Sequence, residues 1–262
     1  MNLESKPAAY SPRIALITGA TSGFGAAIAR RFAATGCRLI ILGRRSERLE
    51  KLTQELPVPI HALSLDVRDR EAVFQMITDL PEDFRDVDLL VNNAGLALGL
   101  EPTHQADLED WDTMIDTNDR ALVSMTRAVL PGMVERGRGH VINIGSVAGS
   151  YPYASGSVYC ASKAFVLQFS LALKADLAGT PVRVTNVDPG LAETEFSVVR
   201  FKGDQKKADA IYAGTTPLVA EDIADTVFWA ATRPAHVNIN RIEVMPTCQG
   251  PGGLMVKRGS GA

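Results

Sequence analysis

The feature that most constrains this chain is a short apolar run that ends in a glycine turn and continues as a helical pattern. Residues 13–18 are rich in β-forming side chains, and after the turn at residues 19–25 apolar residues recur at helical spacing through Phe32. Glycines at such a turn let the backbone approach a pyrophosphate, while free amides and the positive end of the helix face the anion. The segment therefore predicts dinucleotide binding, although a glycine turn can also serve structure alone. The residues expected to contact the cofactor here are Gly19, Thr21, Ser22, Gly23, Phe24 and Gly25.

Strand-like and helix-like segments alternate along the rest of the chain. Further apolar runs predict strands at residues 38–42, 60–65, 88–91, 140–145, 183–187 and 241–245. Helical spacing predicts helices at residues 46–55, 70–80, 107–135 and 220–231, and another that carries Tyr159 and Lys163. This order predicts a single-domain α/β fold of the Rossmann type, a doubly wound parallel sheet flanked by helices. Ligands bind such sheets at the carboxyl ends of the strands.

Composition narrows the choice of partners. The chain has 262 residues, 46% of them hydrophobic, and a formal net charge of −3, which gives no electrostatic reason to expect nucleic acid or an anionic membrane. Cys37, Cys160 and Cys248 are too widely spaced for a disulfide framework or a zinc site, and the four histidines show no ligand spacing. We expect a cytoplasmic protein that holds no metal and whose partners are small molecules and copies of itself.

The ends of the chain and one polar segment differ from the rest. We expect a flexible leader at residues 1–12, a dinucleotide-binding and catalytic domain at residues 13–250, and a Gly-rich tail at residues 251–262. The polar segment at about residues 191–216 has weak periodicity and follows a strand end. Both properties are typical of a lid over a substrate site.

Two arginines follow the second predicted strand, roughly twenty residues beyond the glycine turn, where an NAD-selective site carries an acid for the ribose 2′-hydroxyl. Arg44 and Arg45 stand there instead. Arginine offers a planar fork of donors to phosphate oxygens and remains charged. The pair therefore predicts NADP(H) as the cofactor, unless both residues only open the exposed helix that follows.

Tyr159 and Lys163 stand four residues apart, so they share one face of a helix and the ammonium can lie below the phenol. A free tyrosine titrates near pH ~10, so proton transfer near neutrality requires a shift of roughly 3 units. One nearby cation supplies about 1 to 3 units, and an oxidised nicotinamide ring would add another positive charge. The pair is a candidate general acid/base, although this spacing also occurs by chance.

Other polar or small residues gather where predicted strands end, or interrupt a predicted helix. Asn118 lies inside the long helical stretch, where asparagine is either a tolerated surface residue or a polar group with a purpose. Amides in turns are more often structural, so these residues count mainly in combination. Together with the residues above, they add to the expected cofactor and substrate site Asp66, Val67, Asn93, Ser146, Pro189, Gly190 and Thr194.

These motifs occur in a fixed order over nearly the whole chain: TGxxxGxG from Thr18, NNAG from Asn92, Asn118, Ser146, YxxxK from Tyr159, and PG from Pro189. In that order they resemble the short-chain dehydrogenase/reductase family. The resemblance implies that Tyr159 is the general acid/base and that Ser146 donates a hydrogen bond to the substrate oxygen. It also implies that Lys163 binds the nicotinamide ribose and lowers the phenol pKa, and that Asn118 holds a water in the proton relay.

A narrower resemblance rests on longer segments, among them residues 92–99, 111–118, 126–135 and 196–204. They look like the bacterial NADP-dependent 3-hydroxy acid dehydrogenases, which oxidise serine, L-allo-threonine and 3-hydroxypropionate, reduce malonic semialdehyde and form tetramers. A related group reduces sulfoacetaldehyde, and that substrate or another small carbonyl is the alternative. A regulator that binds NADP without turnover is a remote alternative, because such proteins usually lack the Tyr/Lys pair.

A small anionic substrate would need a cation, and two candidates lie in the expected lid. They are Arg200 and Lys202. Arg200 is the candidate substrate residue, although the same charges could serve only the solubility of the lid.

Overall fold

The structure, a computed structural model, describes residues 9–252 of the chain. Most of the predicted leader and of the predicted Gly-rich tail therefore lies outside the described residues. The predicted domain bounds, including the lid at residues 191–216, stay predictions.

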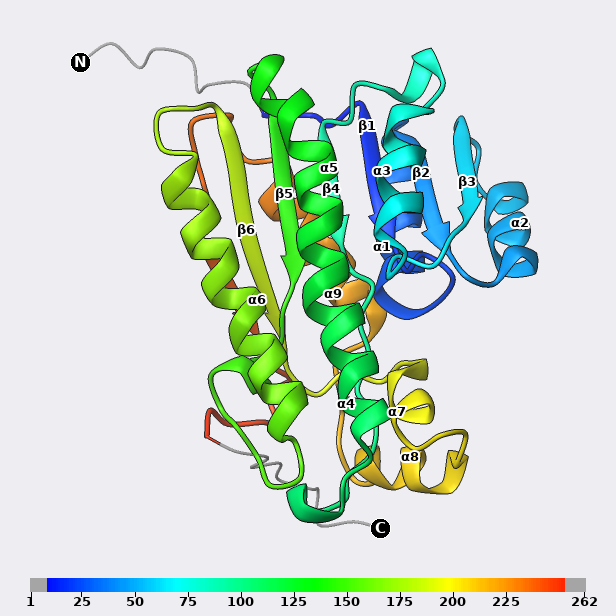
Figure 1. Cartoon of the computed structure of the whole chain (residues 1–262), viewed down its shortest axis with the longest axis vertical. Coiled ribbons are helices and arrows are strands. Elements are labelled where there is room, and N and C mark those ends of the chain that lie inside the picture. Colours follow the sequence, from blue (N-terminus) through cyan, green and yellow to red (C-terminus); the bar gives the residue numbers. More distant parts are fainter. Residues whose placement is uncertain (1–8, 253–262) are drawn as a thin grey trace.

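A seven-stranded sheet forms the centre of the described chain (Figure 1). The strands are β1 (Ile14–Thr18), β2 (Arg38–Gly43), β3 (Ile60–Ser64), β4 (Leu89–Asn92), β5 (Gly139–Ile144), β6 (Val182–Pro189) and β7 (Arg241–Val244). All neighbouring strands pair in parallel, in the order β3-β2-β1-β4-β5-β6-β7. The predicted doubly wound fold is confirmed. The chain reverses direction across the sheet between β1 and β4, which makes their carboxyl ends the switch point for ligand binding.

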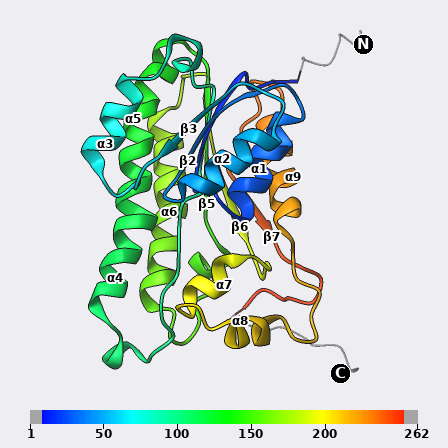
Figure 2. The ribbon, with the colours of Figure 1, turned by 90° about the vertical axis from the view of Figure 1, so that its right-hand side faces the viewer.

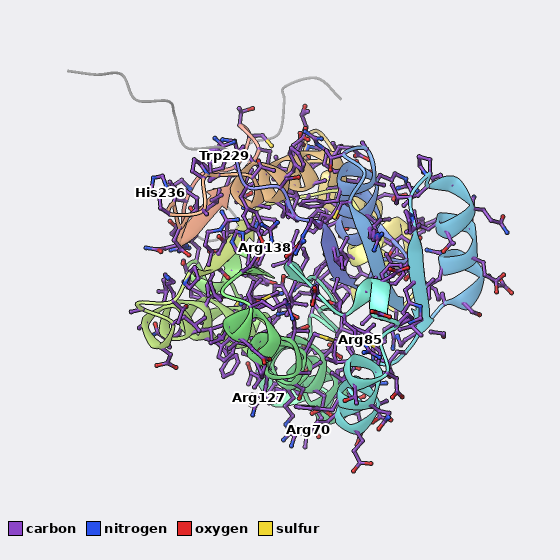
Figure 3. All side chains as sticks on the ribbon, turned by 90° about the horizontal axis from the view of Figure 1, so that it is seen from above. Arg70, Arg85, Arg127, Arg138, Trp229 and His236 are labelled. Carbon is purple, nitrogen blue, oxygen red and sulfur yellow. The ribbon has the colours of Figure 1, made fainter. Side chains whose placement is uncertain are left out.

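Helices cover both faces of this sheet. They are α1 (Gly23–Ala33), α2 (Ser46–Glu55), α3 (Arg70–Thr78), α4 (Leu108–Ile115), α5 (Ala121–Glu135), α6 (Ser157–Asp176), α7 (Glu195–Arg200), α8 (Gln205–Tyr212) and α9 (Ala220–Ala231). Apolar residues of α1, α2 and α9 pack against one face, and those of α3, α5 and α6 pack against the other. In Figure 3, Trp229 of α9 and Arg127 of α5 accordingly lie on opposite sides of the sheet.

The central strands are apolar on both faces because helices cover both. In β1, Ala15 and Ile17 belong to one core cluster, while Ile14 and Leu16 belong to the other. Successive side chains of a strand point to opposite faces, so the continuous apolar run of β1 supplies both cores. The burial of this strand fixes the position of the glycine turn that follows it.

The long helical stretch predicted at residues 107–135 is not one uninterrupted α-helix. A π-helical turn, Asp116–Arg120, separates α4 from α5. Asn118 lies at its centre and is buried, with its amide bonded to the backbone of Leu96. An inserted residue lets the amide face inward while the apolar faces of both helices stay on the core, and π-turns of this kind are frequent at functional sites.

The weakly periodic segment at residues 191–216 contains the short helices α7 and α8. Thr194 caps the first, since its hydroxyl accepts from Phe196 N, and Asp204 caps the second by accepting from Lys207 N. Both helices are too short to produce a clear sequence period. They lie beyond the carboxyl ends of the strands, at the bottom of Figures 1 and 2.

A cluster of charged residues closes the opposite edge of the sheet. Asp88 is fully buried, accepts from Arg138 Nε at 2.7 Å, and accepts from the Arg13 backbone at 2.8 Å. The guanidiniums of Arg138 and Arg183 lie 4.5 and 4.6 Å from the centre of the Tyr10 ring. Arg138 is labelled in Figure 3, which looks onto this edge. Within residues 9–252, no helix has the length and apolarity needed to cross a membrane.

Candidate active site

A cleft of about 330 Å³ opens at the carboxyl ends of the strands, between the switch point and α7. It is lined by nearly all the residues expected at the cofactor site, which are Gly19, Thr21, Ser22, Gly23, Phe24, Arg44, Arg45, Asp66, Val67, Asn93, Tyr159, Lys163, Pro189, Gly190 and Thr194. Ser146 lines it as well. Gly25, Asn118 and Arg200 do not line this cleft, and they lie behind or beside it.

The glycine turn has the shape that a pyrophosphate cradle requires. Gly19 has a φ of +66°, and a Cβ on it would come 3.0 Å from the Ala94 backbone. A Cβ on Gly25 would come within 2.4 Å of the Gly19 carbonyl, so Gly25 packs the helix against the turn and leaves the cleft to its neighbours. The open cradle and the amino end of α1 fit a dinucleotide phosphate.

Thr18 ties the turn after β1 to the turn after β4. Its hydroxyl accepts from the backbone N–H groups of Asn93 and Ala94, at 3.0 and 2.9 Å. In return the Asn93 amide donates to the carbonyls of Thr18 and Gly19. The Asn93 side chain thus holds the turn in shape while the residue lines the cleft. Thr18 belongs to the glycine motif predicted from the sequence, but a threonine that ends a strand carries no signal of this role.

Two arginines, Arg44 and Arg45, line the far end of the cleft. Within residues 9–252 the Arg44 guanidinium forms no hydrogen bond or salt bridge. The pKa of the Asp66 carboxyl is lowered, mainly by the hydrogen bond from Arg68 and to a smaller extent by the charge of Arg44. Arg45 donates to Ser22 Oγ at 2.9 Å and to Glu195 at 3.0 Å. Glu195 was not expected from the sequence, because it stands 150 positions after Arg45 in the chain.

Tyr159 and Lys163 lie on the inner face of α6, at the other end of the cleft. The Lys163 ammonium is 5.9 Å from the centre of the Tyr159 ring and donates to the Ile144 carbonyl at 2.9 Å. Both residues are buried, with 8% and 6% of their surface exposed. Ser146 follows β5 and lies near enough to the phenol to lower its pKa, so the expected Ser, Tyr and Lys side chains meet at one end of the cleft.

The pKa values at this point are set mainly by burial. Burial raises the pKa of Tyr159 well above its ordinary value, and the hydrogen bond from Ser146 and the charge of Arg200 oppose that rise. Burial lowers the pKa of Lys163 to about 8, against the favourable charges of Asp119 and Asp188. The lysine is therefore mostly ionised at neutral pH, but the expected lowering of the phenol pKa is not seen in the protein alone, where burial raises it.

Asn118 is buried next to the cleft and contacts two of the segments that form it. Its amide accepts from Leu96 N at 2.9 Å and donates to Leu96 O and to Ser162 Oγ, at 2.9 and 3.0 Å. Ser162 lies between Tyr159 and Lys163 on α6, so the amide links the π-helical turn to α6. These contacts hold the Asn118 side chain in place, and its role in holding a water of the proton relay stays a prediction.

A buried carboxylate fixes the loop that carries Ser146. Asp188 in β6 accepts from Ser146 N at 2.9 Å and from Arg241 Nε at 2.7 Å. It is fully buried, and a Cβ on Gly145 would collide with its oxygen. From the sequence Asp188 is predicted only to follow a strand, because its partner Arg241 is more than fifty positions away.

Arg200 lies at the end of α7, beside Tyr159. Its guanidinium carbon is 5.9 Å from the Tyr159 ring centre and 5.1 Å from that of Tyr153. Its Nε is buried without a hydrogen-bond partner among the described residues. Lys202, by contrast, pairs with Asp110 at 2.8 Å. The structure therefore brings Arg200 toward Tyr159 and pairs Lys202 with Asp110 instead.

The doubly wound sheet, the glycine cradle and the Ser–Tyr–Lys cluster define a nucleotide-binding oxidoreductase. The chain belongs to the short chain dehydrogenase family, whose model matches residues 13–205. It is 61% identical over 246 residues to the NADP-dependent 3-hydroxy acid dehydrogenase YdfG of Salmonella typhi, covering 94% of this chain and 99% of the relative.

Two further likenesses bear on substrate and cofactor. Sulfoacetaldehyde reductase 2 of Chromohalobacter salexigens is 58% identical over 248 residues, with 94% of this chain and 98% of the relative covered. The solved closed form of serine dehydrogenase complexed with NADP⁺ superposes with a TM-score of 0.90 at 58% identity, covering 94% of this chain and all of that one.

Proposed function

We propose that this protein is an NADP(H)-dependent oxidoreductase of small 3-hydroxy acids or their semialdehydes, such as serine, L-allo-threonine and 3-hydroxypropionate or malonic semialdehyde. The observation that carries the proposal is the meeting of Ser146, Tyr159 and Lys163 at one end of a cleft whose other end holds Arg44 and Arg45. The high identity to a 3-hydroxy acid dehydrogenase and the likeness to serine dehydrogenase with NADP⁺ support this choice.

The roles of the residues follow from their places in the cleft. The glycine cradle would hold the pyrophosphate, Arg44 and Arg45 the 2′-phosphate, and Lys163 the nicotinamide ribose. When bound, the reduced cofactor would supply a hydride and the oxidised cofactor would accept one, and the oxidised ring would place a positive charge near the phenol. During reduction the Tyr159 hydroxyl gives its proton to the substrate oxygen, and during oxidation the phenolate takes the proton back. Ser146 steadies the same oxygen with a hydrogen bond.

Arg200 is proposed to bind the carboxylate of the substrate. Replacing it with Met should raise KM for malonic semialdehyde by roughly tenfold or more and leave a neutral aldehyde little affected, because a hydrogen-bonded charge pair is lost only for the anion. The measurement is the ratio of kcat/KM for the two aldehydes in each enzyme. Equal losses for both would remove Arg200 from this role.

Arg44 offers the cleanest test of cofactor choice, because its guanidinium forms no hydrogen bond or salt bridge within the described residues. Replacing Arg44 with Ala should raise KM for NADPH by roughly tenfold and leave KM for NADH unchanged, since only the phosphate loses a charged donor. Steady-state rates with each cofactor measure this. A matched variant is Arg70→Ala, which removes an arginine of α3 that does not line this cleft. A loss shared by both cofactors would contradict the assignment.

The substrate is tested by initial rates with NADPH and NADH against malonic semialdehyde, sulfoacetaldehyde and a neutral aldehyde, and with NADP⁺ against serine, L-allo-threonine and 3-hydroxypropionate. Higher kcat/KM for the carboxylates would support the proposal. A preference for sulfoacetaldehyde would keep the mechanism and change the substrate, and the likeness to a sulfoacetaldehyde reductase makes that the second candidate. NADPH binding without any turnover would instead favour a regulator.

The homotetramer and the cytoplasmic location remain proposals. Exposed apolar side chains on the outer face of α6 and α5, among them Phe165, Leu171 and Val134, are consistent with an interface between subunits.

A further inference from the structure

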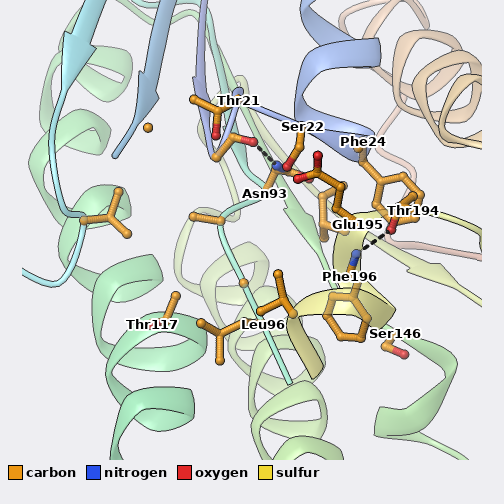
Figure 4. Close-up of a pocket in the computed structure, with 18 of the residues that line it drawn as sticks. Thr21, Ser22, Phe24, Asn93, Leu96, Thr117, Ser146, Thr194, Glu195 and Phe196 are labelled. Carbon is orange, nitrogen blue, oxygen red and sulfur yellow. Dashed lines mark hydrogen bonds between the residues drawn. The ribbon is translucent and has the colours of Figure 1, made fainter. Parts of the chain in front are cut away.

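One carboxylate joins the segment containing α7 to the arginine end of the cleft. Glu195, the first residue of α7, accepts from Arg48 Nη1 through both oxygens, at 2.6 and 2.8 Å. It also accepts from Arg45 Nη1 at 3.0 Å. Arg48 lies in the first turn of α2 and Arg45 immediately before that helix. Figure 4 shows the Glu195 side chain directed toward Ser22 of the glycine turn.

Arg45 extends this contact to the phosphate cradle. Its Nη2 donates to Ser22 Oγ at 2.9 Å and to Thr21 Oγ1 at 3.1 Å, while its Nη1 donates to Glu195. One guanidinium therefore bridges the glycine turn, the segment before α2 and the start of α7. Any anion that fixes this guanidinium also fixes the position of the carboxylate.

The short helix α7 carries the contact on to the reacting end. Phe196 packs its ring 5.7 Å from that of Tyr159, and Arg200 lies 5.9 Å from the same ring. The helix has six residues, so Glu195 and Arg200 lie at its two ends, roughly 9 Å apart. The position of Glu195 therefore bears on the surroundings of the catalytic phenol.

We propose that Glu195 is a positioning residue through which this helix responds to the 2′-phosphate of the cofactor, an inference that rests on the proposed NADP(H) dependence. Arg44, Arg45 and Arg48 carry three positive charges, which match one carboxylate and a phosphate of about −2. The phosphate and Glu195 can thus be held together by shared guanidiniums. Phosphate binding fixes Arg45, which in turn holds α7 closed over the cleft. By linkage, closure of α7 strengthens NADP⁺ binding relative to NAD⁺ binding by the same factor by which the 2′-phosphate favours closure.

This role differs from that of an ordinary surface ion pair. Glu195, Arg45 and Arg48 have 44%, 42% and 45% of their side chains exposed, and pairs this exposed contribute little to folding stability. We therefore expect no change in Tm when Glu195 is replaced. The effect falls on α7 and on the affinity for the phosphorylated cofactor.

The test compares Glu195→Gln with Glu193→Gln, a matched loss of charge on a residue whose carboxylate forms no salt bridge within the described chain. Hydrogen exchange of the backbone amides at residues 196–201 is followed in the free protein, with NADP⁺ and with NAD⁺, and calorimetry gives both affinities. In the wild type and in Glu193→Gln, NADP⁺ should slow exchange more than NAD⁺. In Glu195→Gln that difference should vanish and NADP⁺ affinity should fall about fivefold, with NAD⁺ affinity unchanged.

A double-mutant cycle with Arg48→Ala shows whether the two residues act as a pair. Arg48→Ala alone should repeat the effect of Glu195→Gln, and the double variant should be no worse than either. Additive losses, or a Glu195→Gln variant that behaves as Glu193→Gln does, would overturn the inference while leaving the proposed function intact. A wild-type protein that binds NAD⁺ as tightly as NADP⁺ would overturn the proposed cofactor and this inference with it.

Discussion

Replacing Tyr159 with Phe is expected to lower kcat for aldehyde reduction by roughly 10³-fold while NADPH affinity stays near its wild-type value. Only the proton-transferring hydroxyl is lost, and general acid/base catalysis by one positioned group contributes about 10²- to 10⁴-fold. The ring itself can keep its packing against Phe196. Single-turnover rates and NADPH titration by fluorescence separate the two effects.

Tyr10→Phe is the matched control. Tyr10 is also buried, and its pKa is raised to about 12 by burial, but its hydroxyl bonds to the Asp88 carbonyl at the opposite edge of the sheet. The Tyr10→Phe substitution should lower the free energy of unfolding somewhat and leave kcat unchanged. Substantial turnover by the Tyr159 variant would show that another group transfers the proton.

Replacing Lys163 with Met is expected to lower kcat/KM by at least roughly 10²-fold and to weaken NADPH binding. Methionine keeps much of the buried stem but cannot donate, so the Ile144 carbonyl loses its ammonium partner and the positive charge near the phenol disappears. Because the charge is gone, the pH at which the phenol ionises in the loaded enzyme should move upward. The measurements are NADPH affinity and the pH profile of kcat/KM for alcohol oxidation.

Lys174→Met controls for the loss of a lysine from the same helix. Lys174 also donates to a strand carbonyl, that of Val182 at 3.3 Å, but it does not line the cleft. It should leave both the affinity and the pH profile unchanged. Equal effects of the two substitutions would indicate that Lys163 serves only the packing of α6.

Much of the fold and the cleft could be read from local patterns. The apolar run of β1, the glycines after it and the helical period of α1 predict their own structure, because each depends on neighbours within a few residues. The four-residue spacing of Tyr159 and Lys163 likewise fixes their common face without knowledge of the sheet. The order of such units then predicts a parallel sheet, since short chiral connections leave few other arrangements.

Other features arise only where distant segments meet. The break at Asp116–Arg120 follows from the contact of Asn118 with Leu96, and the short helices α7 and α8 are held by packing more than by their own periodicity. The phenol pKa also depends on tertiary structure. Burial of Tyr159 by the surrounding elements outweighs the helical spacing that suggested a lowered value.

The sequence by itself determined the sheet, the glycine turn, the shared helix face of Tyr159 and Lys163, and the place of Arg44 and Arg45 after a strand, because local periodicity and spacing encode them. Only the tertiary structure decided that Asp188 and Arg241 hold Ser146, that Arg200 faces Tyr159 while Lys202 pairs with Asp110, and that Glu195 reaches Arg45 and Arg48. Charged side chains find such partners across the fold through positions tens to hundreds of residues apart. No local pattern records those distances, so the pairs appear only when the strands bring their carboxyl ends to one edge.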